Sequence, residues 1–120
     1  EYKTNMIDFA CKQFNLDDII KCGLGLTKAE LVVMKHFVTN TSKVCDTVSI
    51  SNKLGLNLTT IQKAVKKLSE KNVLLKHQKN LANGGYIYIY EVNSKDEIRK
   101  ILKGIIKNWS SKVNEKIDEW

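Results

Sequence analysis

The sequence predicts a mainly helical α+β protein, and three observations carry that prediction. Apolar residues recur at helical spacing over most of the chain. A short apolar segment that ends at Gly55 is followed at once by a polar, lysine-bearing helical segment, residues 58–71. Two strand-like runs around an Asn- and Gly-rich tip then occupy residues 73–92. This order of elements predicts a helix-turn-helix followed by a β-hairpin wing.

The amino-terminal region predicts two helices before the helix-turn-helix. Most apolar residues of 5–22 fall at helical spacing, although the polar run 15–18 could interrupt that first helix. Two glycines then break the chain. Thr27 and Glu30 form the T-x-x-E pattern of a capping box, which predicts a second helix from there to about Asn40.

The segment before Gly55 predicts a turn and a short helix. Residues 39–48 are polar turn material, with a short strand expected near Thr47. Ser49 or Ser51 can cap the helix that follows, because a hydroxyl accepts a hydrogen bond from one of the first free N–H groups. Gly55 ends this helix at a position where a positive φ is tolerated.

The next helix, residues 58–71, has the pattern most informative about function. Asn57 is placed to cap it. Its apolar residues share one face, which predicts packing on the core, while the opposite face is polar at first and positively charged further along. That layout is typical of a helix that enters a DNA major groove. The outward residues are Thr59, Thr60, Gln62, Lys63, Lys66 and Lys67.

The hairpin is predicted from 73–79 and 86–92, with the tip between them. Residues 86–92 (YIYIYEV) alternate strictly, so the tyrosines lie on one face, and Ile87 and Ile89 lie on the other. The tyrosines could stack on nucleobases. A solvated or helix-packed sheet face is the simpler interpretation.

A long helix is predicted at the carboxyl end, from a second capping box at Ser94 and Glu97 to near Trp120. At roughly 35 Å it would extend past a small core. We expect its apolar stripe to pair with a second copy of the chain; the alternative is that it packs on the amino-terminal helix of its own chain. The predicted dimerisation residues are Ile98, Ile101, Leu102, Ile105, Trp109, Val113 and Ile117.

The positive charge is concentrated where the predicted helix-turn-helix lies. The chain has 20 Lys and Arg against 13 Asp and Glu. Between Lys53 and Lys79 there are seven lysines and a single acid, Glu70. A focused basic patch indicates a polyanionic partner, whereas its simplest alternative is a solvated lysine face. Arg99 is the only arginine, so bidentate Arg–guanine contacts cannot be the main means of reading bases.

Other classes of function find little support. No run of eighteen apolar residues and no signal-peptide pattern occurs, so we expect a soluble cytoplasmic protein. The chain starts without Met, and we expect further residues upstream. His36 and His77 are far apart, and no catalytic motif occurs, so we predict neither an enzyme nor a cofactor or metal site.

The three cysteines, Cys11, Cys22 and Cys45, are widely spaced and form no CxxC pair. A disulfide framework or a zinc ribbon is therefore not expected. Free thiols are the simplest interpretation, and a redox sensor that uses Cys22 or Cys45 remains an alternative.

The motifs resemble archaeal winged-helix regulators related to the MarR and TrmB families. The matching stretches are GLTKAELVVMKHF (25–37), ISNKLGLNLTTIQKAVKKLSEKNVLLK (50–76) and the hairpin ending YIYIYEV. The resemblance implies a transcription factor, often a repressor, that binds a short inverted repeat as a dimer. TrmB-type regulators often carry a separate effector domain, which we do not expect from these residues, so the resemblance does not imply sugar sensing. Many relatives have Arg at the wing tip, where this chain offers Lys79, Asn80 and Asn83.

The sequence thus predicts an N-terminal helix (1–24), a winged helix-turn-helix core (25–92) and a C-terminal dimerisation helix (93–120). We expect a homodimer that binds double-stranded DNA in a sequence-specific way, with helix 58–71 in the major groove and the wing near the adjacent backbone or minor groove. The alternative is a winged-helix protein–protein interaction module of the transcription or replication machinery. The predicted DNA-binding residues are Lys53, Asn57, Thr59, Thr60, Gln62, Lys63, Lys66, Lys67, Lys76, Lys79, Asn80 and Asn83.

Overall fold

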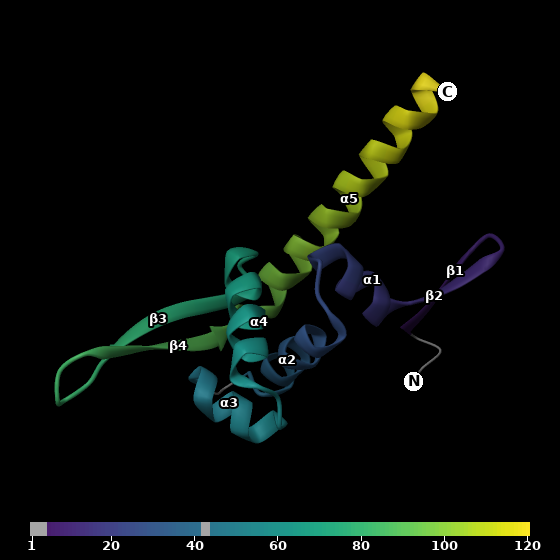
Figure 1. Ribbon diagram of the computed structural model, residues 1–120. Helices are drawn as coiled ribbons and strands as arrows, with labels where there is room; N and C mark the ends of the chain where they lie inside the picture. The colour runs from purple at the N-terminus through teal and green to yellow at the C-terminus, as the bar shows by residue number, and fades with distance from the viewer. Residues whose placement is uncertain (1–4, 42–43) are drawn as a thin grey trace.

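The computed structural model describes residues 5–41 and 44–120 and has principal extents of 62 × 31 × 25 Å. The long dimension arises because one helix projects from the body, as Figure 1 shows. The predicted fold class, a mainly helical α+β winged helix-turn-helix, is confirmed. The elements are β1 (Met6–Phe9), β2 (Lys12–Asn15), α1 (Leu16–Leu24), α2 (Lys28–Thr39), α3 (Thr47–Leu54), α4 (Leu58–Glu70), β3 (Leu74–Asn80), β4 (Tyr86–Val92) and α5 (Lys95–Glu119).

The predicted N-terminal helix (1–24) is wrong over its first half. Strands β1 and β2 form an antiparallel hairpin there, and α1 begins only at Leu16. The polar run that could interrupt the helix does so, because the side chain of Asn15 accepts a hydrogen bond from the Asp17 N–H and starts α1 anew. Ile7 and Phe9 are exposed, so the apolar spacing of this segment serves no buried face. The first four residues of the predicted helix lie outside the described ranges.

The core lies where α1, α2, α3 and α4 meet β3, β4 and the first turns of α5. Its largest fully buried side chain is Phe37 of α2, which is 1% exposed. The predicted capping box at the start of α2 is confirmed, since Thr27 and Glu30 exchange two hydrogen bonds of 2.9 and 3.2 Å. The other buried apolar residues are Leu24, Leu26, Val33, Met34, Ile50, Ile61, Ala64, Val65, Leu68, Val73, Leu74, Tyr90 and Ile98.

The start of α3 differs from the prediction of a short strand near Thr47 and a serine cap. Thr47 is the first residue of α3, and Asp46 caps the helix by accepting a hydrogen bond from the Ser49 N–H at 3.1 Å. The strand-like residue is Cys45, which pairs with Tyr90 of β4 through two backbone hydrogen bonds. This pairing brings Asp46, rather than either serine, to the position before the first helical turn. Gly55 has the predicted positive φ, 66°.

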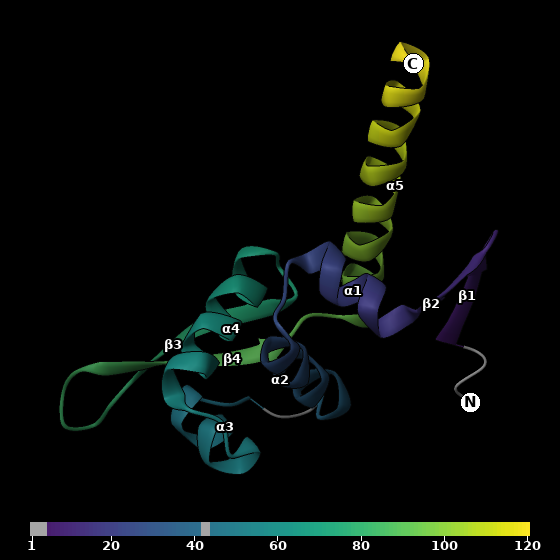
Figure 2. The same cartoon turned by 45° about the vertical axis from the view of Figure 1, so that its right-hand side comes forward.

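The wing is the antiparallel pair β3–β4, whose register places Leu74 opposite Val92 and Asn80 opposite Tyr86. Directly opposite residues of an antiparallel pair share a face. The face that carries Leu74 and Tyr90 is buried on the core at its base. Beyond that base the hairpin extends freely from the body (Figures 1 and 2).

Helix α5 is divided into a packed half and a free half. The predicted cap at Ser94 is confirmed by the hydrogen bond that its hydroxyl accepts from the Glu97 N–H, but the Ser94 N–H donates to Asn93 Oδ1, so the predicted capping box is only half formed. Ile105 lies against α1, where a Cβ built on Gly23 would approach it to 3.2 Å. The alternative of packing on the chain's own first helix is therefore correct for this half. The last turns extend away from the body in both views (Figures 1 and 2), and Trp109 is 61% exposed.

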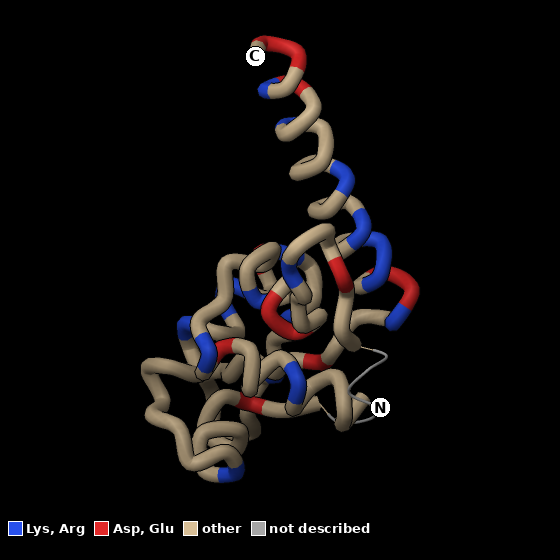
Figure 3. Tube along the Cα trace, turned by 90° about the vertical axis from the view of Figure 1, so that its right-hand side faces the viewer, with Lys and Arg blue, Asp and Glu red and all other residues tan. Residues whose placement is uncertain are grey.

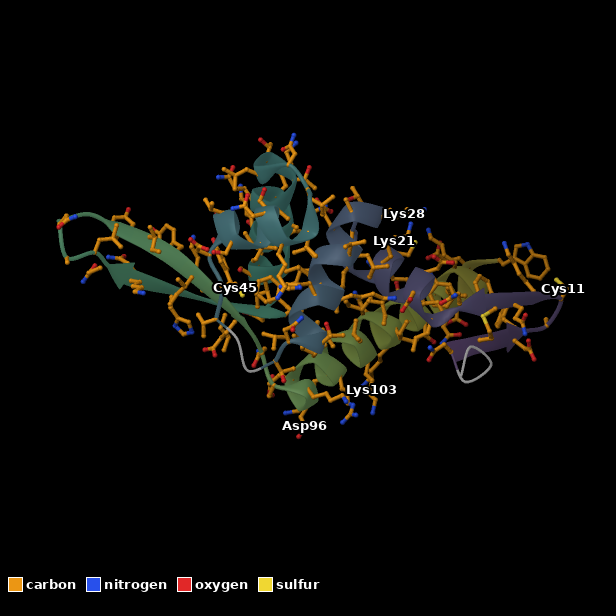
Figure 4. The ribbon with its side chains drawn as sticks, turned by 90° about the horizontal axis from the view of Figure 1, so that it is seen from below. Cys11, Lys21, Lys28, Cys45, Asp96 and Lys103 are labelled. Atoms are coloured by element: carbon orange, nitrogen blue, oxygen red, sulfur yellow. The ribbon has the colours of Figure 1, made fainter. Side chains whose placement is uncertain are left out.

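The described segments contain no helix that is long and apolar enough to cross a membrane. All three cysteines are free. Cys11 lies at the tip of the β1–β2 hairpin (Figure 4). Cys45 lies beside the base of the wing, far from Cys11 (Figure 4). Within the described residues, no three His, Cys, Asp or Glu side chains gather as a metal site would require.

Candidate nucleic-acid interface

Helix α4 is held by its apolar face and presents its polar face to solvent. Ile61 and Ala64 are fully buried against the core, whereas Gln62 and Lys63 are exposed. The helix packs against both α2 and α3. The two-faced pattern of the sequence therefore sets the direction in which the lysines point.

The start of α4 is fixed by Asn57. Its side-chain oxygen accepts hydrogen bonds from the Thr59 and Thr60 N–H groups, at 2.9 and 3.4 Å. The oxygen of Asn57 is thus committed to the cap. Thr59 is exposed and Thr60 is half-buried, so Thr59 is the better placed of the two to reach a base edge.

Lys63 and Lys66 are exposed on the outward face of α4. Neither has an acidic partner within 4.0 Å among the residues that the structure describes. Lys53, in the last turn of α3, is likewise exposed and has no such partner in the described ranges. Ammonium groups that have no internal partner can neutralise phosphates without first breaking an ion pair.

Lys67 differs from these lysines, because its ammonium already has an acidic partner within the chain. Its Nζ donates hydrogen bonds to Glu30 Oε1 at 2.7 Å and to the Gly25 carbonyl at 2.9 Å. The ammonium of Lys67 thereby ties α4 to the start of α2. The Lys67 ammonium would have to leave a carboxylate that is 5% exposed before it could meet a phosphate.

Glu30 is the acid that makes this tie, and no motif of the sequence indicated its second role. Burial by itself would raise its pKa, but the hydrogen bonds from Lys67 and from the Thr27 backbone outweigh it and hold the pKa of Glu30 below its ordinary value. Glu30 is therefore ionised at neutral pH. The Glu30 carboxylate both caps α2, through the Thr27 N–H, and forms an ion pair with Lys67 of α4.

Replacing Glu30 by Ala should lower the free energy of unfolding by about 1–3 kcal/mol, since it removes the cap partner and leaves the part-buried Lys67 ammonium without its carboxylate. Chemical denaturation with urea measures this loss. Glu30→Gln is the matched control, because Gln keeps the capping acceptor and removes only the charge.

Because the pKa of Glu30 is lowered, the same denaturation experiment can be repeated as a function of pH. The stability that its charge contributes is fully present above its ordinary pKa of 4.5 and is lost as the pH falls through the lower folded value. Glu30→Gln should therefore lose less stability than the parent on acidification. Equal losses in both proteins would mean that the Lys67 pair contributes nothing.

The wing adds exposed polar and basic side chains. Lys76, Lys79, Asn80 and Asn83 are all exposed. The Lys76 ammonium lies 3.9 Å from the centroid of the Tyr88 ring, a cation–π contact. The predicted wing residues thus lie on the surface, as direct contact with a polyanion requires.

A groove of about 250 Å³ joins α4 to the wing. Gln62 of α4 and Tyr88 of β4 both line it, together with Asp46 at the start of α3. The hydrogen bond that the Asp46 carboxylate accepts from Ser49 holds the pKa of Asp46 below its ordinary value, with a smaller contribution from Lys79. The structure therefore brings Gln62 and the base of the wing onto one surface, which sequence spacing alone did not show.

The predicted dimerisation residues divide into two groups. Ile98 is buried in the chain's own core, and Ile101, Leu102 and Ile105 pack against that core. These four are core residues in this chain. The remaining three are exposed and line an open hollow of about 370 Å³ along the last turns of α5, together with Trp120 and two lysines. They are Trp109, Val113 and Ile117.

Basic residues also occur along α5 (Figure 3), where acidic residues are interspersed with them. Three of these basic side chains, including Arg99 and Lys100, pair with acids on the same helix. The charge of α5 is therefore partly balanced. The charge of α4 on its outward face is not.

Comparisons with known proteins give this chain a family and relatives of similar structure. Residues 14–114 match the model of the DnaD N-terminal domain. A solved structure from Methanosarcina mazei Go1, described as a possible transcriptional regulator, is 47% identical and superposes with a TM-score of 0.90 over 96% of each chain. A crystal structure of a protein from the archaeon Sulfolobus tokodaii shares the fold, with a TM-score of 0.64 and 21% identity over 80% of this chain and 92% of its own.

Among curated proteins, an uncharacterized protein of Methanocaldococcus jannaschii is 26% identical over 110 residues, which are 91% of this chain and 81% of the relative. The subtype implied by the resemblance to MarR and TrmB regulators is not confirmed by these comparisons. They support the winged-helix fold.

Proposed function

The chain belongs to the DnaD N-terminal domain family, and we propose that it is a sequence-specific DNA-binding transcriptional regulator that acts as a homodimer. Its similarity to the possible transcriptional regulator of Methanosarcina mazei supports the regulatory role. In this proposal α4 enters the major groove, and the wing contacts the adjacent backbone or minor groove.

The observation that carries the proposal is the outward face of α4. Lys63 and Lys66 are exposed and have no acidic partner among the described residues, on a helix whose opposite face is buried. These ammonium groups would neutralise phosphates on the two sides of the groove. The DNA would thus meet a rigid, preformed cationic surface.

In this proposal, the polar side chains near the start of α4 recognise the base edges. Gln62 can pair with the N6 and N7 positions of adenine, and the methyl group of Thr59 can contact that of thymine. Each such contact discriminates between bases by about 1–3 kcal/mol. With Arg99 on α5 as the only arginine, we expect the preferred site to contain A·T pairs.

The homodimer is supported by the free half of α5. Trp109 and Ile117 are 61% and 59% exposed on one apolar stripe, an arrangement that is costly in water and that a second copy of the helix would cover. Two-fold symmetry would place the two α4 helices about one helical turn of DNA, roughly 34 Å, apart. An inverted repeat would match that spacing.

A salt titration of DNA binding tests the proposal. The logarithm of the association constant should fall linearly with the logarithm of the salt concentration, with a slope of about −0.9 for each neutralised phosphate. Fluorescence anisotropy with labelled genomic fragments gives that slope. No binding even at low salt would overturn the proposal, and a shallow slope would favour the alternative of a protein–protein interaction module.

A further inference from the structure

One face of the wing carries a row of tyrosines that extends beyond the core. In the register of β3 and β4, Tyr90 lies opposite Lys76, Tyr88 opposite Gln78, and Tyr86 opposite Asn80. These residues share one face of the hairpin. The row begins in the core and runs outward along the wing.

The three tyrosines differ sharply in burial. Tyr90 is 6% exposed, while Tyr88 and Tyr86 are 40% and 52% exposed. The rings of Tyr86 and Tyr88 meet edge to face, with centroids 5.3 Å apart. Of the three, Tyr90 is the one that completes the core at this edge, so the fold does not require the two outer rings for its packing.

The charge around these rings suits an anion. The Lys76 ammonium sits over one face of the Tyr88 ring at 3.9 Å, so a base would stack on the other face of that ring or take this face once the ammonium turns to a phosphate. Two acids lie near the base of the wing. Asp46 lines the same groove as Tyr88, and its carboxylate accepts a hydrogen bond from the Ser49 N–H. Glu91 lies on the opposite face of the hairpin and is held by His77 at 2.6 Å. Aromatic faces next to an ammonium group form the usual platform for single-stranded nucleic acid, in which bases stack on rings and phosphates meet the cation.

The row also lies beside the helix that would carry the DNA. Tyr88 lines the same groove as Gln62 of α4, so a strand leaving the outward face of α4 would meet Tyr88 next. A base inside an intact duplex offers only its edge to a side chain, whereas an unpaired base offers its full ring. Exposed rings therefore favour an unpaired base over a paired one.

We propose that Tyr86 and Tyr88 form a stacking site for unpaired nucleobases, with Lys76 holding the adjacent phosphate, so that the protein prefers DNA that is locally open beside the α4 site. This site rests on the proposed function in one respect, since α4 brings the DNA to the wing. The stacking itself requires nothing of α4.

The test compares three labelled probes by fluorescence anisotropy with the full chain: an AT-rich duplex, the same duplex with a short central mismatch bubble, and one strand alone. Tyr86→Leu/Tyr88→Leu removes the rings, and Tyr86→Phe/Tyr88→Phe keeps the rings while removing the hydroxyls. The parent should bind the bubble about tenfold more tightly than the duplex for each stacked base. The Phe variant should keep this preference, and the Leu variant should lose it with its duplex affinity unchanged.

The outcomes separate the two proposals. Binding to none of the probes overturns the proposed function, whereas equal binding of duplex and bubble by the parent overturns only the stacking site. A bubble preference that survives in the Leu variant, or that disappears in the Phe variant, also overturns the stacking site. Quenching of 2-aminopurine placed in the bubble gives a second readout with the parent protein, and an unchanged emission on binding would contradict stacking.

Discussion

Reversing the charge of both exposed lysines on α4, Lys63→Glu/Lys66→Glu, is expected to lower the affinity for DNA by about a hundredfold or more at low salt. Each substitution removes a phosphate contact and places a repelling carboxylate at the same point. The salt slope should also become shallower by about 0.9 for each lost contact. Fluorescence anisotropy over a range of salt concentrations measures both effects.

A control with the same change in net charge distinguishes a local contact from general attraction. Lys95→Glu/Lys103→Glu makes that change on α5, and Lys103 lies on its outer side, away from α4 (Figure 4). This variant should keep most of the affinity and the full slope. If both variants lose affinity equally, the outward face of α4 is not where the DNA binds.

Placing charges on the free half of α5, Trp109→Asp/Ile117→Asp, is expected to convert a homodimer into a monomer. Each of these side chains should contribute about 1.5–3 kcal/mol when fully buried. In a two-fold dimer each substitution acts twice, once in each copy. The dimer dissociation constant should therefore rise by several orders of magnitude, and light scattering at micromolar concentration should report the mass of one chain.

The matched control is Asn108→Asp/Ser111→Asp, which adds the same charge on the other side of the helix, in the turn that contains Trp109. It should leave the mass of the dimer unchanged. A parent protein that is already monomeric at high concentration would refute the proposed homodimer. The charged α5 variant should still fold as a monomer, since Trp109 and Ile117 are both exposed and lie outside the core cluster of the single chain.

Local patterns determined much of the fold and of the candidate site. Capping boxes and caps act over a few residues, so Thr27, Asn57 and Ser94 marked the starts of three helices correctly. Helical periodicity gave the two faces of α4, and strict alternation gave the faces of β4. These signals are local, and they therefore require no knowledge of what each face meets.

The errors arise where a residue's partner is distant in the sequence. The strand expected near Thr47 is instead the pairing of Cys45 with Tyr90, which shifts the cap to Asp46 and joins segments 45 residues apart. In the amino-terminal segment the helical spacing of apolar residues wrongly predicted a helix. No core packs against these residues, so nothing stabilises a helix with that apolar face.

The sequence by itself determined that a helix with an apolar face and a lysine face would precede a two-stranded wing. Only the tertiary structure decided which of those lysines is free, because Lys67 meets Glu30 across 37 positions of the chain while Lys63 and Lys66 meet none of the described acids. It likewise divided the stripe of α5 into a core half and a free half. The physical reason is the same in both cases: periodicity fixes the direction of a side chain, but burial and charge pairing depend on which distant element the fold brings to it.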